Sequence, residues 1–220
     1  MRKPRVTNGF VSFTEVEPGH HATYNAWHLF DHMPEQFPLA GLVFGQRWVL
    51  TPALRRSARA EPPLDRTHYF TLYLMAEPIE QTLHEFRDLA VALRDKNRFH
   101  EHRTSHLAGP LEVSDASAAP AALVGADAVP YRPNRGAHVW LTQTAVPLDE
   151  VCAIEGVAGA WAFAPSELSP PELQPMTMTV AWLDGDPTDA ATVLADVVET
   201  ARFSATLAAI DPWSRWDWFD

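Results

Sequence analysis

The chain has 220 residues, of which 46% are hydrophobic and 20% are charged, so its composition is that of a globular protein with one compact domain or two small ones. A net charge of −11 repels phosphate backbones and anionic lipids, and no apolar run is long enough for a membrane helix, so neither nucleic acid nor membrane is an expected partner. The single cysteine, Cys152, and the lack of a signal-peptide pattern lead us to expect a cytoplasmic protein.

The first half of the chain has the pattern of a strand, a helix, two strands and a second helix. Residues 6–16 alternate between apolar and polar side chains, as a half-buried strand does. The helix that follows ends near Pro34 and Pro38, because proline lacks a backbone donor and restricts the residue before it. The predicted elements are a strand at 6–16, a helix at 20–33, strands at 42–51 and 68–75, and a helix at 79–96.

After an irregular region at 97–135, the same order of elements returns in shorter form. Strands are predicted at 138–144, 156–165 and 176–187 and a helix at 188–203, whereas the short segment 147–155 replaces the long first helix. We therefore expect three parts: a first repeat at 1–113, a linker at 114–135 rich in Ala, Pro, Gly and Asp, and a degenerate second repeat with a Trp-rich tail at 136–220.

A βαββα unit with antiparallel strands is ferredoxin-like, and its sheet has one uncovered face. Two units in one chain bury both faces when the sheets close against each other into a barrel. The prediction is an α+β fold of two ferredoxin-like repeats that enclose a cavity, either as a monomer with an internal pseudo-dimer or as a homodimer.

The first predicted helix has two unlike faces. At 100° per residue its apolar side chains gather on one arc, which packs on the sheet. The opposite arc holds Tyr24, Trp27, His28, Asp31, His32 and Glu35. This polar arc is either a solvated helix face or an active site. Solvated faces are usually rich in Lys, Glu and Gln, whereas this one combines two aromatic residues with two histidines and contains no lysine.

The two histidines of the polar arc are four residues apart and are therefore neighbours on a helix. His28 and His32 have the spacing of helical zinc sites, but no third ligand is evident and the intervening residues are not those of HExxH, so no metal is expected. A general acid/base role for His32 is the preferred interpretation. The helix C-terminus and the carboxylates of Asp31 and Glu35 favour its protonated form, which would place its pKa in the range useful near neutral pH.

Residues 25–49 (NAWHLFDHMPEQFPLAGLVFGQRWV) resemble the signature of EthD-like dimeric α/β-barrel proteins. The matching positions are Trp27, Asp31, His32, Pro34, Gly41, Arg47 and Trp48. Two positions differ from the signature: Asp31 stands where Glu is more usual, and Ala40 stands where Pro often precedes the glycine. The resemblance implies a cavity between two sheets, faced by the histidine at the end of the first helix. Relatives in this superfamily include cofactor-free cyclases, lactone isomerases, monooxygenases and haem enzymes, and the fold alone does not choose among them.

Further candidates lie on the predicted strands and in the irregular region. His68 and Tyr69 begin one strand, and His138 and Trp140 share a face of another, so these four are candidate substrate-binding residues. The segment 98–106 either holds a carboxylate substrate or is a loop with chance histidines. A haem, if bound, would use one of His68, His102, His106 and His138. The tail 211–220, with three Trp, is expected to dock on the barrel or at an oligomer interface.

These observations predict a small-molecule enzyme without an organic cofactor, acting as a lyase, isomerase or cyclase on an apolar, aromatic or polycyclic oxygenated substrate. In this interpretation Asp31 orients His32, and His28, Tyr24 or Arg47 polarises a carbonyl or enolate. Trp27 and Trp48 complete the expected substrate-binding set. The alternatives are a non-catalytic ligand-binding protein and a haem-dependent enzyme on the same barrel.

Overall fold

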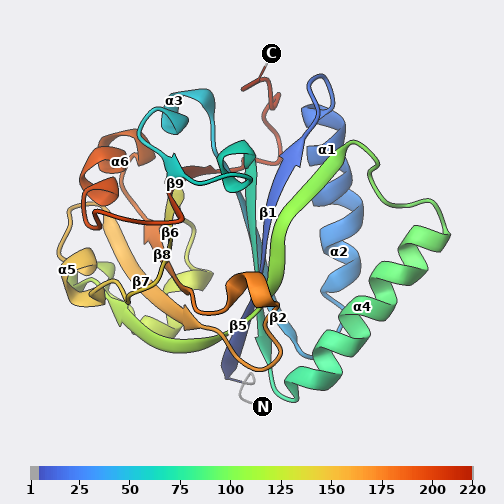
Figure 1. Cartoon of the computed structure of the whole chain (residues 1–220), viewed down its shortest axis with the longest axis horizontal. Coiled ribbons are helices and arrows are strands. Elements are labelled where there is room, and N and C mark those ends of the chain that lie inside the picture. Colours follow the sequence, from blue (N-terminus) through green and yellow to red (C-terminus); the bar gives the residue numbers. More distant parts are fainter. Residues whose placement is uncertain (1–4, 220) are drawn as a thin grey trace.

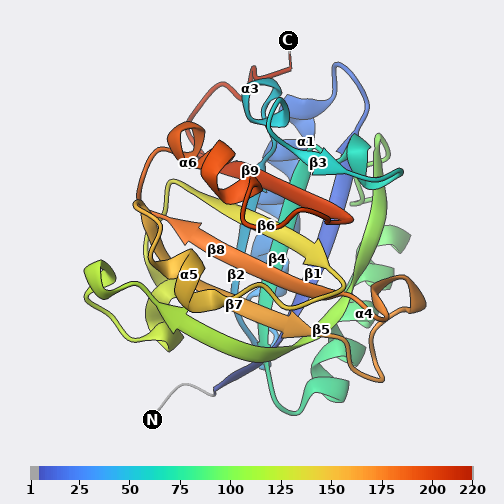
Figure 2. The ribbon, with the colours of Figure 1, turned by 60° about the vertical axis from the view of Figure 1, so that its left-hand side comes forward.

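The computed structural model describes residues 5–219 and consists of a closed antiparallel β-barrel with helices on its outside (Figures 1 and 2). Each half of the chain contributes four strands. The order around the barrel is β2-β4-β1-β5-β7-β8-β6-β9, and pairing of β2 with β9 closes it. The strands are β1 (Val6–Val16), β2 (Leu42–Val49), β4 (Tyr69–Ala76), β5 (Arg103–Ala118), β6 (Gly136–Thr142), β7 (Val157–Ala164), β8 (Thr177–Leu183) and β9 (Phe203–Ala209).

The helices form two separate covers (Figure 1). One long helix of the first half is divided into α1 (His21–Trp27), a π-helical turn (His28–His32) and α2 (Met33–Gln36), and it lies beside α4 (Ile79–Asp95). The second half has only α5 (Leu148–Cys152) and α6 (Pro187–Ala195). The remaining short elements are α3 (Pro52–Arg55), β3 (Arg59–Ala60) and 3-10 turns at Leu64–Arg66, Pro120–Ala122, Ala126–Tyr131 and Pro171–Leu173.

The predicted α+β fold of two ferredoxin-like halves is confirmed, but each half has one strand more than predicted. The unit is βαββαβ, and its last strand is β5 in the first half and β9 in the second. Gly109 and Pro110 interrupt the alternating pattern of β5. Phe203, where β9 begins, was predicted to be the last residue of a helix. Both strands were therefore missed.

Strand β5 also corrects the predicted boundary between the repeats. It pairs with β1 from Arg103 to Glu112 and with β7 from Glu112 to Ala118, so one continuous strand joins the two sheets. The boundary predicted after residue 113 falls inside this strand. The segment between the halves therefore begins after residue 118.

Between the two sheets, where a cavity was predicted, large side chains of residues 5–219 pack into one buried cluster. Alternation directs Val11 and Phe13 of β1 inward, where they meet Phe163 of β7 and Trp182 of β8 in one buried cluster. The fit is close: a Cβ atom added to Gly9 would lie 2.8 Å from a ring carbon of Phe163. Aromatic residues thus supply the core of the barrel and leave the outer faces of the sheets for a site.

The C-terminal tail docks on the barrel, which is one of the two alternatives predicted from the sequence. The Phe219 ring stacks on His21, with 4.1 Å between ring centroids, and Trp218 packs against the buried cluster that contains Tyr69. Trp213, in contrast, is 84% exposed and touches Phe30 of the π-helical turn. The tail therefore covers the N-terminal end of the first long helix.

A packed interior makes Phe163 a structural residue. We expect Phe163→Ala to lower the free energy of unfolding by about 3 to 5 kcal/mol, because it removes buried ring area and leaves a void. Urea denaturation measures this loss. The control Val193→Ala, at a side chain that is 54% exposed on α6, changes stability by less than about 0.5 kcal/mol. Equal losses in the two variants would contradict a packed interior.

Candidate functional site

A cavity of about 220 Å³ lies on the outer face of the first sheet, beneath its helices. Its floor is formed by β1, β4 and β5, and the long helix, α4 and the segment before β5 enclose it. The lining residues are Phe10, Ser12, Thr14, Thr71, Tyr73, Ser105 and Ala108 from the sheet, and Tyr24, Trp27, His28, His32, Gln36, Phe86, Ala90, Arg94, Phe99 and Arg103 around it.

The π-helical turn presents both histidines of the polar arc to this cavity. Its wider turn spans His28–His32, and such turns are frequent at functional sites. The ring centroids of His28 and His32 are 5.1 Å apart, and the Trp27 indole stacks on His32 at 4.5 Å. Tyr24 also lines the cavity. Four of the six residues of the polar arc therefore face the cavity, and the solvated-face alternative does not describe them.

The two carboxylates of the arc lie elsewhere. Arg98 donates to Asp31 Oδ1 at 2.8 Å and to Glu35 Oε1 at 2.6 Å, and its backbone carbonyl accepts from Trp27 Nε1 at 2.7 Å. These contacts fasten the segment before β5 to the helix. The predicted contact of Asp31 with His32 is not formed, since Nδ1 of His32 has no hydrogen-bond partner within residues 5–219.

Burial and positive charge keep the two histidines neutral, contrary to the expected imidazolium. Burial, followed by the charges of Arg103 and Arg47, lowers the pKa of His32 to about 4, and Asp31 opposes this only partly. Burial and Arg47 lower the pKa of His28 well below its ordinary value. The predicted helix-end effect is outweighed because desolvation penalises the charged ring and two arginines lie nearby.

The cavity is cationic and has unused polar atoms. Arg94 and Arg103 line it, and no carboxylate does so among the described residues. Within the same residues, several buried polar atoms around the cavity have no hydrogen-bond partner: His28 Nδ1, His32 Nδ1, Tyr73 Oη, Gln36 Oε1 and Arg103 Nε. Buried polar groups are rarely left unpaired, so these atoms are available to water or to a bound molecule.

Arg47 and Tyr69 were predicted to bind substrate, but they lie behind the cavity wall. The Arg47 guanidinium packs 4.8 Å from the Tyr24 ring centroid, and its Nη2 donates to Asn25 Oδ1 at 3.1 Å. Asn25 Nδ2 in turn donates to the Tyr69 hydroxyl at 3.0 Å. Arg47 therefore acts on the site through its charge and through its support of Tyr24.

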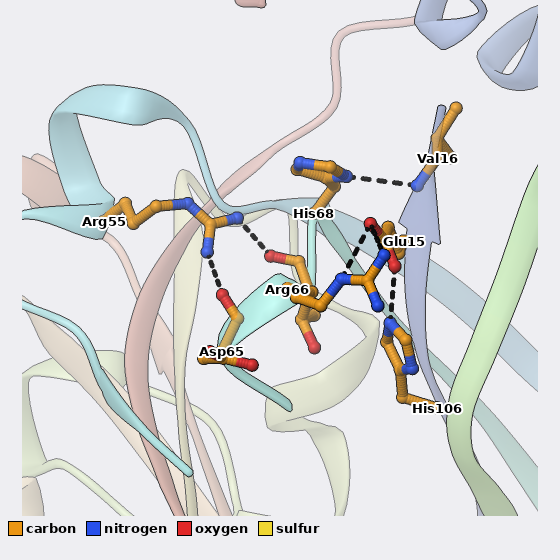
Figure 3. A network of polar contacts seen from close by, with 8 residues as sticks. Glu15, Val16, Arg55, Asp65, Arg66, His68 and His106 are labelled. Carbon is orange, nitrogen blue, oxygen red and sulfur yellow. Dashed lines mark hydrogen bonds and ion pairs between the residues drawn. The ribbon is translucent and has the colours of Figure 1, made fainter. Parts of the chain in front are cut away.

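Trp48 and His68 are outside the cavity as well. Trp48 belongs to the barrel interior, where its Nε1 donates to Asn134 Oδ1 at 3.0 Å. His68 lies at the end of the barrel, and its Nδ1 accepts from the Val16 backbone N–H at 3.1 Å (Figure 3). Neither side chain lines the cavity.

The corresponding space in the second half is filled. His138 and Trp140 occupy on β6 the outward positions that Phe10 and Ser12 occupy on β1, so a large indole replaces a small hydroxyl. Trp140 is fully buried, and its Nε1 donates to the Leu194 carbonyl of α6 at 3.2 Å. Both ring nitrogens of His138 are hydrogen-bonded, to Thr206 and Ser204. These two predicted binding residues therefore belong to a packed core.

Several cavity residues were not identified from the sequence, among them Gln36, Thr71, Tyr73, Phe86, Arg94 and Phe99. One signal was available on β1: Ser12 and Thr14 are small and polar on a face that should pack against a helix. Small polar residues beneath a helix indicate a space. The cavity-lining residues of α4, in contrast, have no feature in the sequence that indicates a cavity.

The described residues do not fit a haem. Of the four histidines considered as an iron ligand, His138 has both ring nitrogens hydrogen-bonded, to Thr206 and Ser204. The other three lie in contact with residues outside the cavity: His68 with Val16, His102 with Glu17 and His106 with Glu15. None of the four lines the cavity. A cavity of about 220 Å³ exceeds the roughly 150 Å³ known to hold benzene, but a haem is several times larger than benzene.

Comparison with known proteins identifies the fold. No protein-family model and no curated protein sequence matches the chain. A candidate chlorite dismutase aligns over 97% of this chain and 99% of its own length, with a TM-score of 0.55 and 10% identity. A variant of chlorite dismutase from Candidatus Nitrospira defluvii aligns over 98% and 95%, with a TM-score of 0.53 and 9% identity.

A candidate monooxygenase from Fusobacterium nucleatum is similar over 94% of both chains, with a TM-score of 0.53 and 11% identity. Identities this low establish the architecture and leave the chemistry open. No helix within residues 5–219 is long and apolar enough to cross a membrane. The chain thus has the dimeric α/β-barrel fold, with both ferredoxin-like halves in one polypeptide.

The buried histidines make stability depend on pH. Burial lowers the pKa of His138 to about 3, so the unfolded chain binds a proton below pH 6.5 that the folded chain does not. Stability is therefore highest above pH 6.5 and falls as the pH drops toward 3. We expect His138→Gln to reduce this slope by about 1.4 kcal/mol per pH unit between pH 6 and 4, as measured by urea denaturation.

The matched control for that experiment is His84→Gln, since the His84 side chain is 75% exposed on α4. Its slope should equal that of the unmodified chain. An unchanged slope in His138→Gln would show that His138 titrates alike in the folded and unfolded states.

Proposed function

We propose that the chain is a small-molecule enzyme that uses histidine acid/base chemistry without an organic cofactor, on an aromatic, oxygenated substrate bound in the cavity. The observation that carries this proposal is the pair of neutral imidazoles, His28 and His32, which line one cavity together with Arg94 and Arg103. Within residues 5–219 the Nδ1 atoms of both rings have no hydrogen-bond partner. A lyase, an isomerase and a cyclase all need a base beside a site that stabilises negative charge.

His32 is the proposed base. The Gln36 amide lies 3.4 Å from its Nε2, measured to the amide nitrogen. When the amide oxygen of Gln36 is turned toward that ring nitrogen, it accepts the Nε2–H and leaves Nδ1 free to take a proton. Gln36 thereby fills the positioning role that the sequence assigned to Asp31. Stacking against Trp27 fixes the plane of the ring.

The arginines stabilise the negative charge that proton removal leaves on the substrate. His32 Nδ1 takes a proton from a carbon or hydroxyl of the substrate, and the electron pair stays on the substrate as an enolate or phenolate. Arg94 and Arg103 both line the cavity, and their positive charges stabilise that oxygen. The anion raises the pKa of the nearby imidazole, so the proton is then returned at another position or to a leaving group.

The lining defines the class of substrate. Phe10, Phe86, Phe99 and Trp27 offer apolar ring faces, and the hydroxyls of Ser12 and Tyr73 offer hydrogen bonds. The volume suits one or two fused rings. The barrel is closed within one chain, so a second copy is not needed to complete the cavity. The chlorite dismutase and monooxygenase names of the fold relatives are compatible with an enzyme, but their low identities do not transfer a reaction.

Hydrogen exchange at carbon tests the proposal without knowledge of the natural substrate. The chain is incubated in D₂O with one- and two-ring ketones such as 1-indanone and 2-tetralone, and deuterium incorporation next to the carbonyl is followed by NMR. We expect exchange to be accelerated by the unmodified chain and to fall by about 10²-fold or more in His32→Gln. His28→Gln should also be slower, since it removes a polar group of the same cavity.

The control is His84→Gln, an exposed histidine outside the cavity, which should keep full activity. Exchange that is as fast in His32→Gln and His28→Gln as in the unmodified chain would contradict the proposal. Binding of the ketones without acceleration would favour a ligand-binding protein. A Soret band in protein from haem-supplemented cells, together with activity that needs it, would favour the haem-dependent alternative.

A further inference from the structure

A group of three metal-ligating side chains lies at the rim of the barrel, outside the cavity. Glu17 follows β1, His20 precedes α1 and His102 precedes β5. One nitrogen or oxygen ligand atom from each lies within 4.8 Å of those from the other two. Segments 85 residues apart in the sequence thus bring two imidazoles and a carboxylate to one point.

The backbone holds the three residues in place. A tight turn joins Glu17 to His20, whose N–H donates to the Glu17 carbonyl at 3.1 Å, and Gly19 within it adopts a φ of +81°. The Glu17 N–H donates to the His102 carbonyl at 3.1 Å, so β5 is tied to the same turn. The imidazoles of His20 and His102 stack with 3.5 Å between centroids.

The carboxylate of this group lacks the partners that its neighbour has. Glu15, two residues earlier, contacts Arg66 at 2.8 Å and His106 at 2.8 Å, so both of its oxygens are paired (Figure 3). Glu17 contacts only His102, through Oε2 and Nδ1 at 2.8 Å, and no Arg or Lys pairs with it among the described residues. A site with two imidazoles and an unneutralised carboxylate matches the donor set that zinc prefers.

We propose that Glu17, His20 and His102 bind one divalent transition metal ion, with zinc as the preferred ion. Zinc bonds of about 2.0 to 2.2 Å require ligand atoms about 3.3 Å apart, and rotation of half-exposed side chains closes the remaining gap. Three protein ligands leave the other positions to water. The chain's charge of −11 attracts a cation to this surface.

A metal ion at this site restrains one end of the cavity wall. His102 is adjacent to Arg103, which lines the cavity, and the Arg103 guanidinium lies 5.4 Å from the Trp27 ring centroid. Arg98 already fastens the start of this segment to the long helix. A metal at His102 fastens its end to the turn before α1, so the cavity wall is fixed at both ends.

Zinc binding to the tag-free, metal-stripped chain tests the site by isothermal titration calorimetry with zinc chloride. We expect one zinc per chain, and a loss of affinity of at least tenfold in both His20→Gln and His102→Gln. His106→Gln is the matched control, because His106 lies four residues after His102 and likewise pairs with a glutamate at 2.8 Å. Among residues 5–219 it belongs to no group of three metal-ligating side chains. This control should bind zinc as the unmodified chain does.

Two further measurements make the result decisive. X-ray absorption at the zinc edge should show two imidazoles per metal, and zinc should raise the Tm of the unmodified chain and of His106→Gln but not of His20→Gln or His102→Gln. Equal zinc affinity in His20→Gln, His102→Gln and the unmodified chain would overturn the proposal, as would an equal loss in His106→Gln. These readouts do not involve turnover, so they stand apart from the test of the proposed enzyme activity.

Discussion

The alternation of side chains along the barrel strands is the constraint on which the rest of the structure depends. Inward positions carry residues such as Phe13, Phe163 and Trp182, which fill the interior and exclude a ligand from it. The cavity that the polar arc lines accordingly lies between the outer face of the first sheet and its helices. Outward positions then decide which half is open: Ser12 leaves space beneath the first long helix, and Trp140 removes it in the second half.

The same burial that creates the cavity decides its chemistry. A solvent-exposed pair of histidines would be partly protonated near neutral pH, whereas His28 and His32 are kept neutral by desolvation and by the charges of Arg47 and Arg103. The arginines remain charged, and no carboxylate among the described lining residues neutralises them. Neutral imidazoles thus lie beside fixed positive charge, which makes them weaker bases but stabilises a substrate anion in the cavity.

The sequence predicted the fold better than the site. The tandem repeat of alternating strands and amphipathic helices predicted two ferredoxin-like halves, because that pattern is local. Strand β5 was missed since its Gly109-Pro110 pair breaks the pattern and pairing with β1 and β7 restores it. The polar arc of the first helix identified Tyr24, Trp27, His28 and His32, and the structure brings them together at one cavity. The role of Asp31 depended on Arg98, 67 residues away, which no local pattern reveals.

The protonation of His32 tests the central claim most directly. In a ¹⁵N-histidine NMR titration assigned with His32→Gln, a ring buried in the cavity beside two arginines should stay neutral through pH 7 and titrate with a midpoint near a pKa of about 4. A midpoint near the ordinary value of about 6.5 would show a solvated ring, and the polar arc would then be a helix surface and not an active site.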